Sequence, residues 1–488
     1  MGVGDIYSGD ISLERNMRQV TNPYLPGWEY VPDGEPYVFD GRVYVYGSHD
    51  FFGGSVYCMG DYVCWSADEN DLGTWRYEGV IYKKSQDPYN ADLQGNLYAP
   101  DVAKGPDGRY YLYYVLSNRG TVGVAVCDTP AGQYRFYGYV HYEDGTLLGD
   151  GKGDEPQFDP GVLVEGENVY LYTGFCARGD KSRHGAMATV LSSRDMLTVK
   201  RAPVFVAPGC EYSRGTGFEG HEFFEAPSIR RIFGKYCFIY SSILCHELCW
   251  AVSDSPTEGF RYMGVLVSGC DKGITLGGKP SDRPLYYTAN NHGSIVKIAG
   301  GWYVFYHRHT NGTNYSRQGC LEKLKPENGF IPQAEITSCG SLRPLRGEGE
   351  YPAYIACNLF TDTECTYVPW SGWMDDRFPK ITQECTGEHP GSFIANMASG
   401  ATAGFKYFEL NSVKAVSVRV MGYAHGRMLV KTAPDGEVCA SIPVHYANVW
   451  YDAEAEACLP DGVHALYFSF EGEGRVNFSS FRLITEDK

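Results

Sequence analysis

Five segments of the chain share one pattern, in which turn residues precede a strand of alternating aromatic and aliphatic residues. They read FDGRVYVYG (39–47), PDGRYYLYY (106–114), EGENVYLYT (165–173), FGKYCFIY (233–240) and AGGWYVFY (299–306). We take the second residue of each strand as its reference, which gives Tyr44, Tyr111, Tyr170, Cys237 and Tyr303. The successive separations between these residues are 67, 59, 67 and 66 positions. This length fits one propeller blade of four strands with its loops. The sequence therefore predicts a five-bladed β-propeller over residues 1–340.

Composition supports an all-β fold. Among 488 residues, 39 Tyr and 59 Gly indicate short strands joined by turns, and the aromatics are expected to pack mostly between blades. The net charge of −17 is spread along the chain without a basic stripe, so nucleic acid is not expected as a partner. An acidic surface suits a neutral ligand better than a polyanion.

The N-terminal sequence MGVGDIYSGDISLERNMRQV contains no apolar core of signal-peptide length, and no stretch approaches a membrane span. We expect a cytoplasmic protein without a membrane partner. The 16 cysteines form no CxxC pair and are expected to be reduced and mostly buried. A metal site at Cys245 and Cys249 is disfavoured, as is a zinc site in HEFFE (221–225), which lacks the second His of HExxH.

Each repeat also carries an ionisable residue 10 to 12 positions before its reference residue, namely Asp33, Asp101, Asp159, Glu225 and His292. Equivalent positions on the inner strands of a propeller converge on its axis. Four carboxyls and an imidazole there are costly for stability alone, which indicates function. For a single site the alternative is a turn, as in Pro-Asp-Gly at 32–34.

Clustered carboxylates repel one another, so their pKa values are pushed apart. This separation supplies an ionised base and a protonated acid at one pH, which glycoside hydrolysis requires. Two such groups about 6.5–9.5 Å apart leave room for a water, and the reaction then inverts the anomeric configuration. A third carboxylate can hold the acid in place and keep its pKa high.

Several segments carry a family resemblance in their order and spacing: NPYLPGWEYVPDGEPYVFDGRVYVYGSHD (22–50), LYAPDV (97–102), FDPGVLVEGENVYLYTGF (158–175), FFEAPSIRRIFGKYCFIYS (223–241), AVSDSP (251–256) and NHGSIVKIAGGWYVFYHR (291–308). Over roughly residues 20–340 the chain resembles glycoside hydrolase family 43. The resemblance implies inverting, exo-acting hydrolysis, usually of arabinofuranosides or xylosides.

By position, the resemblance implies that Asp33 is the general base, Asp159 the acid-orienting carboxylate and Glu225 the general acid. It gives Asp101 a supporting role. It also implies that His292 helps to hold a structural calcium ion at the axis through water, while the chemistry itself requires no cofactor.

The resemblance also implies that Arg308 is a funnel arginine that can contact the substrate or the neighbourhood of Glu225. Tyr98 stands where the family commonly has Trp, and Phe224 lies beside the acid. Trp28 is a candidate wall for a sugar ring, with a core role as the alternative. Because the family's Asp-Pro is here Asp33-Gly34-Glu35-Pro36, Glu35 remains a rival for the base.

After Gly340 the pattern changes. Residues 341–352 are rich in Gly, Pro and charge and are expected to form a linker. Residues 353–488 show alternating strands at intervals of about 8–12 residues, which is typical of a β-sandwich. This region is similar to carbohydrate-binding modules of family 6. Trp370, Trp373 and Trp450 are candidate sugar platforms, although a core role is preferred for each. The alternatives to sugar targeting are that the module shapes the active-site rim or supports oligomerisation.

These observations predict an exo-glycosidase that releases a terminal pentose from plant-derived oligosaccharides such as arabinoxylan or arabinan fragments. The first expectation is α-L-arabinofuranosidase activity. β-Xylosidase activity, another exo-furanosidase or galactanase activity, and a non-catalytic sugar-binding propeller remain as alternatives. The oligomeric state is left open.

Overall fold

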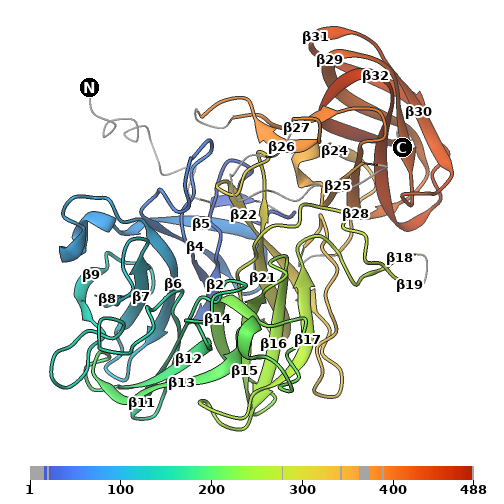
Figure 1. Cartoon of the computed structure of the whole chain (residues 1–488). Coiled ribbons are helices and arrows are strands. Elements are labelled where there is room, and N and C mark those ends of the chain that lie inside the picture. Colours follow the sequence, from blue (N-terminus) through green and yellow to red (C-terminus); the bar gives the residue numbers. More distant parts are fainter. Residues whose placement is uncertain are drawn as a thin grey trace, which may run out of the picture.

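The computed structural model describes residues 16–18, 21–276, 279–340, 343–361, 374, 376–386 and 390–485. Five successive sheets follow one another along the chain and form the blades of a propeller (Figure 1). The helices of the described residues are single 3-10 turns, none able to cross a membrane: Lys84–Gln86, Pro88–Asn90, Cys210–Tyr212 and Ala353–Ile355. The predicted all-β fold with a five-bladed propeller is confirmed, and a further sheet-rich region follows it.

The blades are built in chain order. The first contains β2 (Glu35–Phe39), β3 (Arg42–Tyr46), β4 (Tyr62–Asp68) and β5 (Asp71–Tyr82), with β1 (Asn16–Arg18) paired to β5. The second contains β6 (Leu97–Lys104), β7 (Tyr110–Leu116), β8 (Val122–Cys127) and β9 (Arg135–Tyr139). The third contains β10 (Gly161–Glu165), β11 (Asn168–Thr173), β12 (Gly185–Ser192) and β13 (Val199–Pro208).

The fourth blade contains β14 (Phe223–Ile232), β15 (Lys235–Ser242), β16 (Glu247–Ser253) and β17 (Arg261–Ser268). A short hairpin, β18 (Thr275–Leu276) and β19 (Lys279–Pro280), follows it. The fifth contains β20 (Ile295–Ile298), β21 (Gly301–His309) and β22 (Arg317–Leu324). The five repeats of the sequence are the second strands of these sheets, β3, β7, β11, β15 and β21.

Aromatic side chains pack between the blades, as the alternation predicted. Phe39 of the first blade meets Tyr110 of the second edge to face, with ring centroids 5.0 Å apart. Tyr172 of the third blade lies 5.8 Å from Phe238 of the fourth. Burying such large rings contributes strongly to the stability of the contacts between blades.

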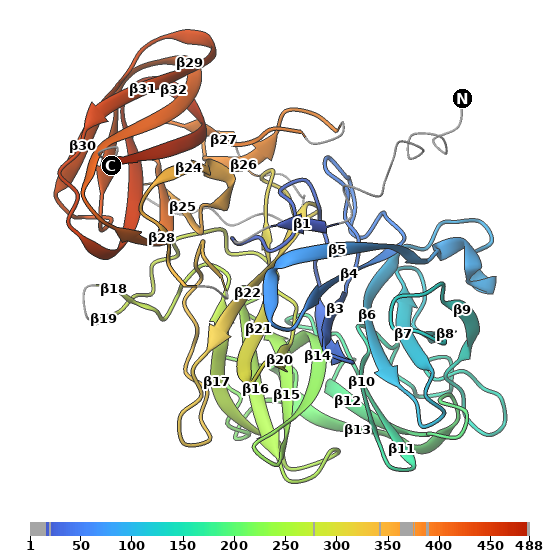
Figure 2. The ribbon, with the colours of Figure 1, turned by 180° about the vertical axis from the view of Figure 1, so that it is seen from behind.

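The first strands of the blades lie around the axis. Strand β2 contacts both β6 and β20, and β10 contacts β6 and β14. A parallel backbone bridge also joins Gly34, just before β2, to Gly293, just before β20. The segments that lead into these strands therefore meet at one mouth of the axis. Strands β6, β10, β14 and β20 lie near one another in the middle of the propeller (Figure 2).

The ring is closed by residues 22–24, which lie against the last blade. The backbone N–H of Tyr24 donates to Gly319 O of β22 at 3.2 Å. The Asn22 amide donates to Leu321 O at 2.9 Å and to Thr337 O at 3.0 Å, while its oxygen accepts from Leu321 N at 3.0 Å. All polar atoms of this buried amide are satisfied, which fixes the two ends of the propeller together.

The C-terminal module forms one ten-stranded sheet that curls around its own core (Figure 1). Its strands are β23 (Leu345–Arg346), β24 (Gly349–Pro352), β25 (Asn358–Phe360), β26 (Lys380–Gln383), β27 (Ser392–Met397), β28 (Thr402–Leu410), β29 (Val413–Lys431), β30 (Val438–Val444), β31 (Ala447–Glu456) and β32 (Gly462–Thr485). The stretch expected as a linker is thus partly in the sheet, because β23 pairs with β28 and β24 with β32.

The two modules share one hydrophobic core. Trp250 and Tyr286 of the propeller belong to the same buried cluster as Leu359 and Phe405 of the C-terminal module. An ion pair also crosses the boundary, because Lys406 Nζ lies 2.6 Å from Asp271 Oδ2. The modules are therefore packed as one unit.

Candidate active site

Four of the five ionisable residues in register lie together at the mouth of the axis. Asp33 precedes β2, Asp159 precedes β10 and His292 precedes β20, while Glu225 lies near the start of β14. His292 Nδ1 is 3.8 Å from Asp33 Oδ1 and 3.7 Å from Asp159 Oδ2. Burial lowers the pKa of His292 to about 4, so its imidazole is neutral.

The backbone at these positions is strained. Asp33, Asp159 and Ala226 have φ values of +58°, +45° and +62°, in the left-handed region that L-residues with a side chain rarely adopt. Ala226 N donates to Asp159 Oδ2 at 3.2 Å, so Asp159 holds the residue that follows Glu225. Such conformations persist where the surrounding structure enforces them, and they cluster at functional sites.

Arg317 at the start of β22 is the ionic partner of Asp33. Its NH1 donates to Asp33 Oδ1 at 2.8 Å. Its Nε donates to Asp50 Oδ2 at 2.8 Å and its NH2 to Asp50 Oδ1 at 3.1 Å. The ring of Tyr57 lies 4.8 Å from its Cζ atom. The planar guanidinium is thus fixed on two sides, and its charge faces the Asp33 carboxylate.

The pKa values of the carboxyls diverge. Burial is the largest single influence and would raise the pKa of Asp33, but the charge of Arg317, the hydrogen bond from His307 and the nearby imidazoles together hold that pKa well below the usual range. Burial, followed by the negative charge of Asp33, raises the pKa of Glu225 to about 7. Burial and the charges of Glu225 and Asp33 raise the pKa of Asp159 well above its usual value. Near pH 7 the site therefore holds an ionised Asp33 beside a Glu225 that is protonated in about half of the molecules.

Asp101 and Glu35 lie apart from this group. Asp101 Oδ1 accepts from Tyr37 OH at 2.7 Å, and its Oδ2 accepts from Val162 N at 2.7 Å. Glu35, on β2, is an ionic partner of Arg230 at 2.5 Å. The contacts of Asp101 agree with a supporting role, and those of Glu35 set it apart from Asp33 as a candidate base.

The hydrogen bonds of Arg308 lead to residues other than these carboxyls. Its NH1 donates to Ala356 O at 2.7 Å, and its NH2 donates to Tyr354 O at 2.6 Å and to Gln318 Oε1 at 3.1 Å. These partners place it at the boundary with the C-terminal module. The arginine that contacts a candidate catalytic carboxylate is Arg317, nine residues later, which the sequence interpretation missed.

The other candidate substrate contacts, Tyr98, Phe224 and Trp28, differ in exposure and surroundings. Tyr98 is partly exposed, and besides burial the charges of Asp159 and Glu225 act on its phenol, so it lies close to both. Phe224 is buried and packs on Phe175 with centroids 5.1 Å apart. Trp28 is partly exposed in the segment that leads to Asp33.

Comparison with known proteins now identifies the chain. A family model, Glycosyl hydrolases family 43, matches residues 21–331, well over half of the chain. The chain belongs to glycosyl hydrolase family 43. This family 43 enzyme is 60% identical over 473 residues to a protein named Xylosidase/arabinosidase from Thermoclostridium stercorarium, covering 96% of this chain and 100% of that protein.

Two further similarities are weaker. A Xylosidase/arabinosidase from Bacteroides ovatus is 29% identical over 302 residues, which are 57% of this chain and 83% of that protein. A solved structure of a family 43 arabinoxylan arabinofuranohydrolase from Bacillus subtilis, in complex with cellotetraose, aligns with a TM-score of 0.51 at 20% identity. It covers 95% of this chain and 97% of that chain, which shows a common fold.

Besides Arg317, two further residues of the candidate active site, Asn290 and Tyr57, were not singled out from the sequence. Asn290 makes a hydrogen bond that lowers the pKa of Glu225, against the burial and the Asp33 charge that raise it. The oxygen of Asn290 is held by His309 Nε2 at 2.6 Å. Tyr57 lies beside Arg317. Both residues come from loops, where no periodic pattern marks them.

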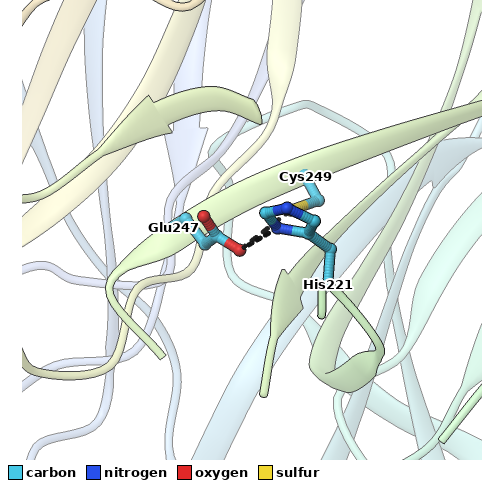
Figure 3. Close-up of side chains that lie close together, drawn as sticks. All are labelled: His221, Glu247 and Cys249. Carbon is cyan, nitrogen blue, oxygen red and sulfur yellow. Dashed lines mark hydrogen bonds and ion pairs between the residues drawn. The ribbon is translucent and has the colours of Figure 1, made fainter. Parts of the chain in front are cut away.

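Outside the axis, the family 43 enzyme holds His221, Glu247 and Cys249 close together (Figure 3). His221 Nδ1 is 2.6 Å from Glu247 Oε1, which also accepts from Ser242 Oγ at 2.6 Å. Burial, followed by the charge of Glu247, raises the pKa of the Cys249 thiol well above its usual value, whereas metal binding needs the thiolate. The pKa of His221 is raised and that of Glu247 is lowered, as in an ion pair, and the Cys249 Sγ atom lies 3.5 Å from Glu247 Oε1.

Proposed function

We propose that this glycoside hydrolase removes a terminal pentose from an oligosaccharide with inversion, using Asp33 as base and Glu225 as acid. The observation that carries the proposal is the divergence of the two pKa values, with Asp33 held ionised by Arg317 and Glu225 at about 7. Asp159 acts as a positioning residue through its bond to Ala226 N.

In this mechanism a water oxygen attacks the anomeric carbon while the bond from that carbon to the leaving oxygen breaks. Asp33 accepts a proton from the water, and Glu225 donates its proton to the leaving oxygen. Exchange with solvent restores both groups for the next turnover. No cofactor takes part in these steps.

The sugar we propose first is α-L-arabinofuranose, released from arabinoxylan or arabinan fragments. β-D-Xylose is the alternative, and both fit the name Xylosidase/arabinosidase carried by the relatives from Thermoclostridium stercorarium and Bacteroides ovatus. Turnover of nitrophenyl arabinofuranoside, xyloside and galactoside would rank the sugars. Proton NMR of the first product formed would test inversion, and product that retains its configuration would contradict the mechanism.

The acid and the base can be tested separately. Asp33→Asn should reduce turnover by several orders of magnitude on every substrate. Glu225→Gln should retain more activity on substrates with good leaving groups, because protonation of the leaving oxygen then matters less. If Glu225→Gln shows no such dependence on the leaving group, Glu225 is not the acid.

For the C-terminal module, we propose a fold like that of family 6 carbohydrate-binding modules and a role at the active-site rim. Tyr30 lies three residues before Asp33, and its OH donates to Gln383 Oε1 of β26 at 2.6 Å. Trp450 donates to Glu384 Oε1 at 3.0 Å and packs on Phe393, which supports a structural role. The candidate platforms Trp370 and Trp373 lie outside the described residues.

Gln383→Leu should therefore lower kcat on a small nitrophenyl substrate, with Glu384→Gln as the neighbouring control. Strong retention of the wild-type enzyme on insoluble arabinoxylan, lost in Trp450→Ala, would contradict this role. We also propose a reducing, cytoplasmic location, which is supported by the fifteen cysteines of the described residues, all of them free.

A further inference from the structure

A buried ionic cluster lies around the axis beside the candidate catalytic residues. Arg230 of β14 places its NH2 2.5 Å from Glu35 Oε2 of β2. Ser228 Oγ donates to the same oxygen at 3.1 Å and lies 2.8 Å from Ser294 Oγ. The side chain of Glu35 is only 2% exposed and that of Arg230 is 11% exposed. These contacts connect the first, fourth and fifth blades.

The cluster extends to the second blade through Tyr37. The Arg230 guanidinium lies over the Tyr37 ring, with Cζ 4.4 Å from the centroid. Tyr37 OH in turn donates to Asp101 Oδ1 at 2.7 Å, and Asp101 Oδ2 accepts from Val162 N of the third blade. One guanidinium thus links the innermost segments of all five blades, directly or through one or two intervening side chains.

The charges of the cluster are close to balance. The titratable groups that face Arg230 are Glu35 and Tyr37 on β2, Asp101 on β6 and Cys237 on β15. Burial raises the pKa of Glu35 to about 8 and that of Asp101 to about 6. Near neutral pH the two carboxyls therefore carry about one negative charge, which Arg230 neutralises.

The residues at the axis do not fit the calcium ion that the resemblance implied beside His292. Calcium takes about six to eight oxygen ligands, drawn from carboxylates, carbonyls and waters. Here Asp33 Oδ1 is bonded to Arg317, and Glu35 Oε2 is bonded to Arg230. Among the buried side-chain atoms described, Glu35 Oε1 is one without a partner, but a single free oxygen does not make a calcium site.

We propose that Arg230 is the resident cation of this propeller axis, and that the enzyme holds its inner strands together without a calcium ion. Because Glu35 lies two residues after Asp33, Arg230 is also a positioning residue for the segment that carries the proposed base. The positioning role of Arg230 rests on the proposed function of Asp33, whereas its role as the cation of the axis does not.

The structural part is tested by thermal unfolding of the full chain. After dialysis against EDTA, the wild-type enzyme should show the same Tm with excess CaCl2 as with EDTA. It should also give no calcium-competed terbium luminescence. A resident calcium site at a hundredfold excess over its Kd would raise the free energy of unfolding by about 2.7 kcal/mol, so it would be detected. A calcium-dependent rise in Tm or calcium-competed terbium binding would overturn the proposal.

Variants test the charge of Arg230. Arg230→Met should lower Tm more at about pH 8 than at about pH 5, because ionised Glu35 and Asp101 are then buried without a cation, whereas protonated carboxyls are not penalised. Arg230→Lys should restore part of the loss. Arg231→Met is the matched control, since Arg231 is an exposed neighbour 3.7 Å from Glu165.

An equal loss for Arg230→Met at both pH values, without rescue by Lys, would show that Arg230 acts through packing alone and would refute the proposal. If Arg230→Met fails to fold, the Lys variant and the calcium titration of the wild-type enzyme still decide it. None of these measurements uses turnover, so their outcome is independent of whether Asp33 is the base.

Discussion

Replacing Lys406 by Met should destabilise the whole protein, because this lysine is a buried charge at the boundary of the two modules. Its Nζ lies 2.6 Å from Asp271 Oδ2 and 2.9 Å from Glu335 Oε1. The side chains of Lys406 and Asp271 are 2% and 1% exposed. Met has a similar length and no charge, so the substitution removes the ion pair while it keeps most of the packing.

The magnitude follows from what Asp271 retains. Removing one partner of a buried pair costs about 3–5 kcal/mol, because the other charge stays buried. Asp271 would still accept from Asn358 Nδ2 and from Ile336 N, both at 2.9 Å. We therefore expect a loss near the lower end, about 3 kcal/mol, or roughly a hundredfold in the unfolding equilibrium.

Urea denaturation followed by tryptophan fluorescence measures this loss. Lys380→Met is the control, since Lys380 pairs at 2.8 Å with Asp376, whose side chain is 78% exposed. That surface pair should contribute less than about 1 kcal/mol. Equal losses for the two variants would refute the reasoning. So would a double variant Lys406→Met, Asp271→Asn that is no more stable than Lys406→Met alone.

Three further changes test the chemistry and the domain boundary. Values of kcat/KM should stay level up to about pH 7 and then fall about tenfold per pH unit, since deprotonated Glu225 has no proton to donate; a profile that rises above pH 7 would contradict the acid assignment. In Arg317→Met, kcat/KM should fall at acid pH within the measurable range, because the pKa of Asp33 rises when the charge of Arg317 is removed. Arg317→Lys, which keeps the charge, should reverse much of this change. A chain ended at residue 340 should lose solubility because it exposes the shared core, and a soluble product with wild-type Tm would exclude that dependence.

The propeller could be predicted because its signal is repeated five times. Each repeat places aromatic residues at alternate positions of its second strand. One departure from the pattern, Cys237 where the other repeats have Tyr, therefore did not hide the period. The same register located Asp33, Asp159, Glu225 and His292, whose side chains the structure brings to one mouth of the axis.

The register could not show what each carboxyl contacts. Asp101 shares the spacing, yet its oxygens accept from Tyr37 and from Val162 N of the next blade. The arginine is a similar case. Arg308 and Arg317 lie on neighbouring strands, β21 and β22, and the contact with Asp33 depends on how loops 310–316 and 51–61 fold against the first blade. Loop geometry of this kind has no period in the sequence.

The structure of the boundary between the two modules, at residues 341–352, could also not be predicted from the sequence pattern. Gly, Pro and charged residues at 341–352 are typical of a linker, but edge strands tolerate the same residues. Here Tyr351 pairs with Phe481 across β24 and β32. Only the long-range partner, 130 residues away, decides between the two.

The closure of the propeller by residues 22–24 has a consequence during synthesis on the ribosome. Asn22 and Tyr24 emerge first, but their partners in β22 and at Thr337 are translated about three hundred residues later. Since the segment carrying Asp33 follows directly, this proposed base cannot reach Arg317 until the last blade has left the exit tunnel. A nascent chain can thus form its middle blades early, whereas hydrolytic competence arrives only when the two ends of the ring meet.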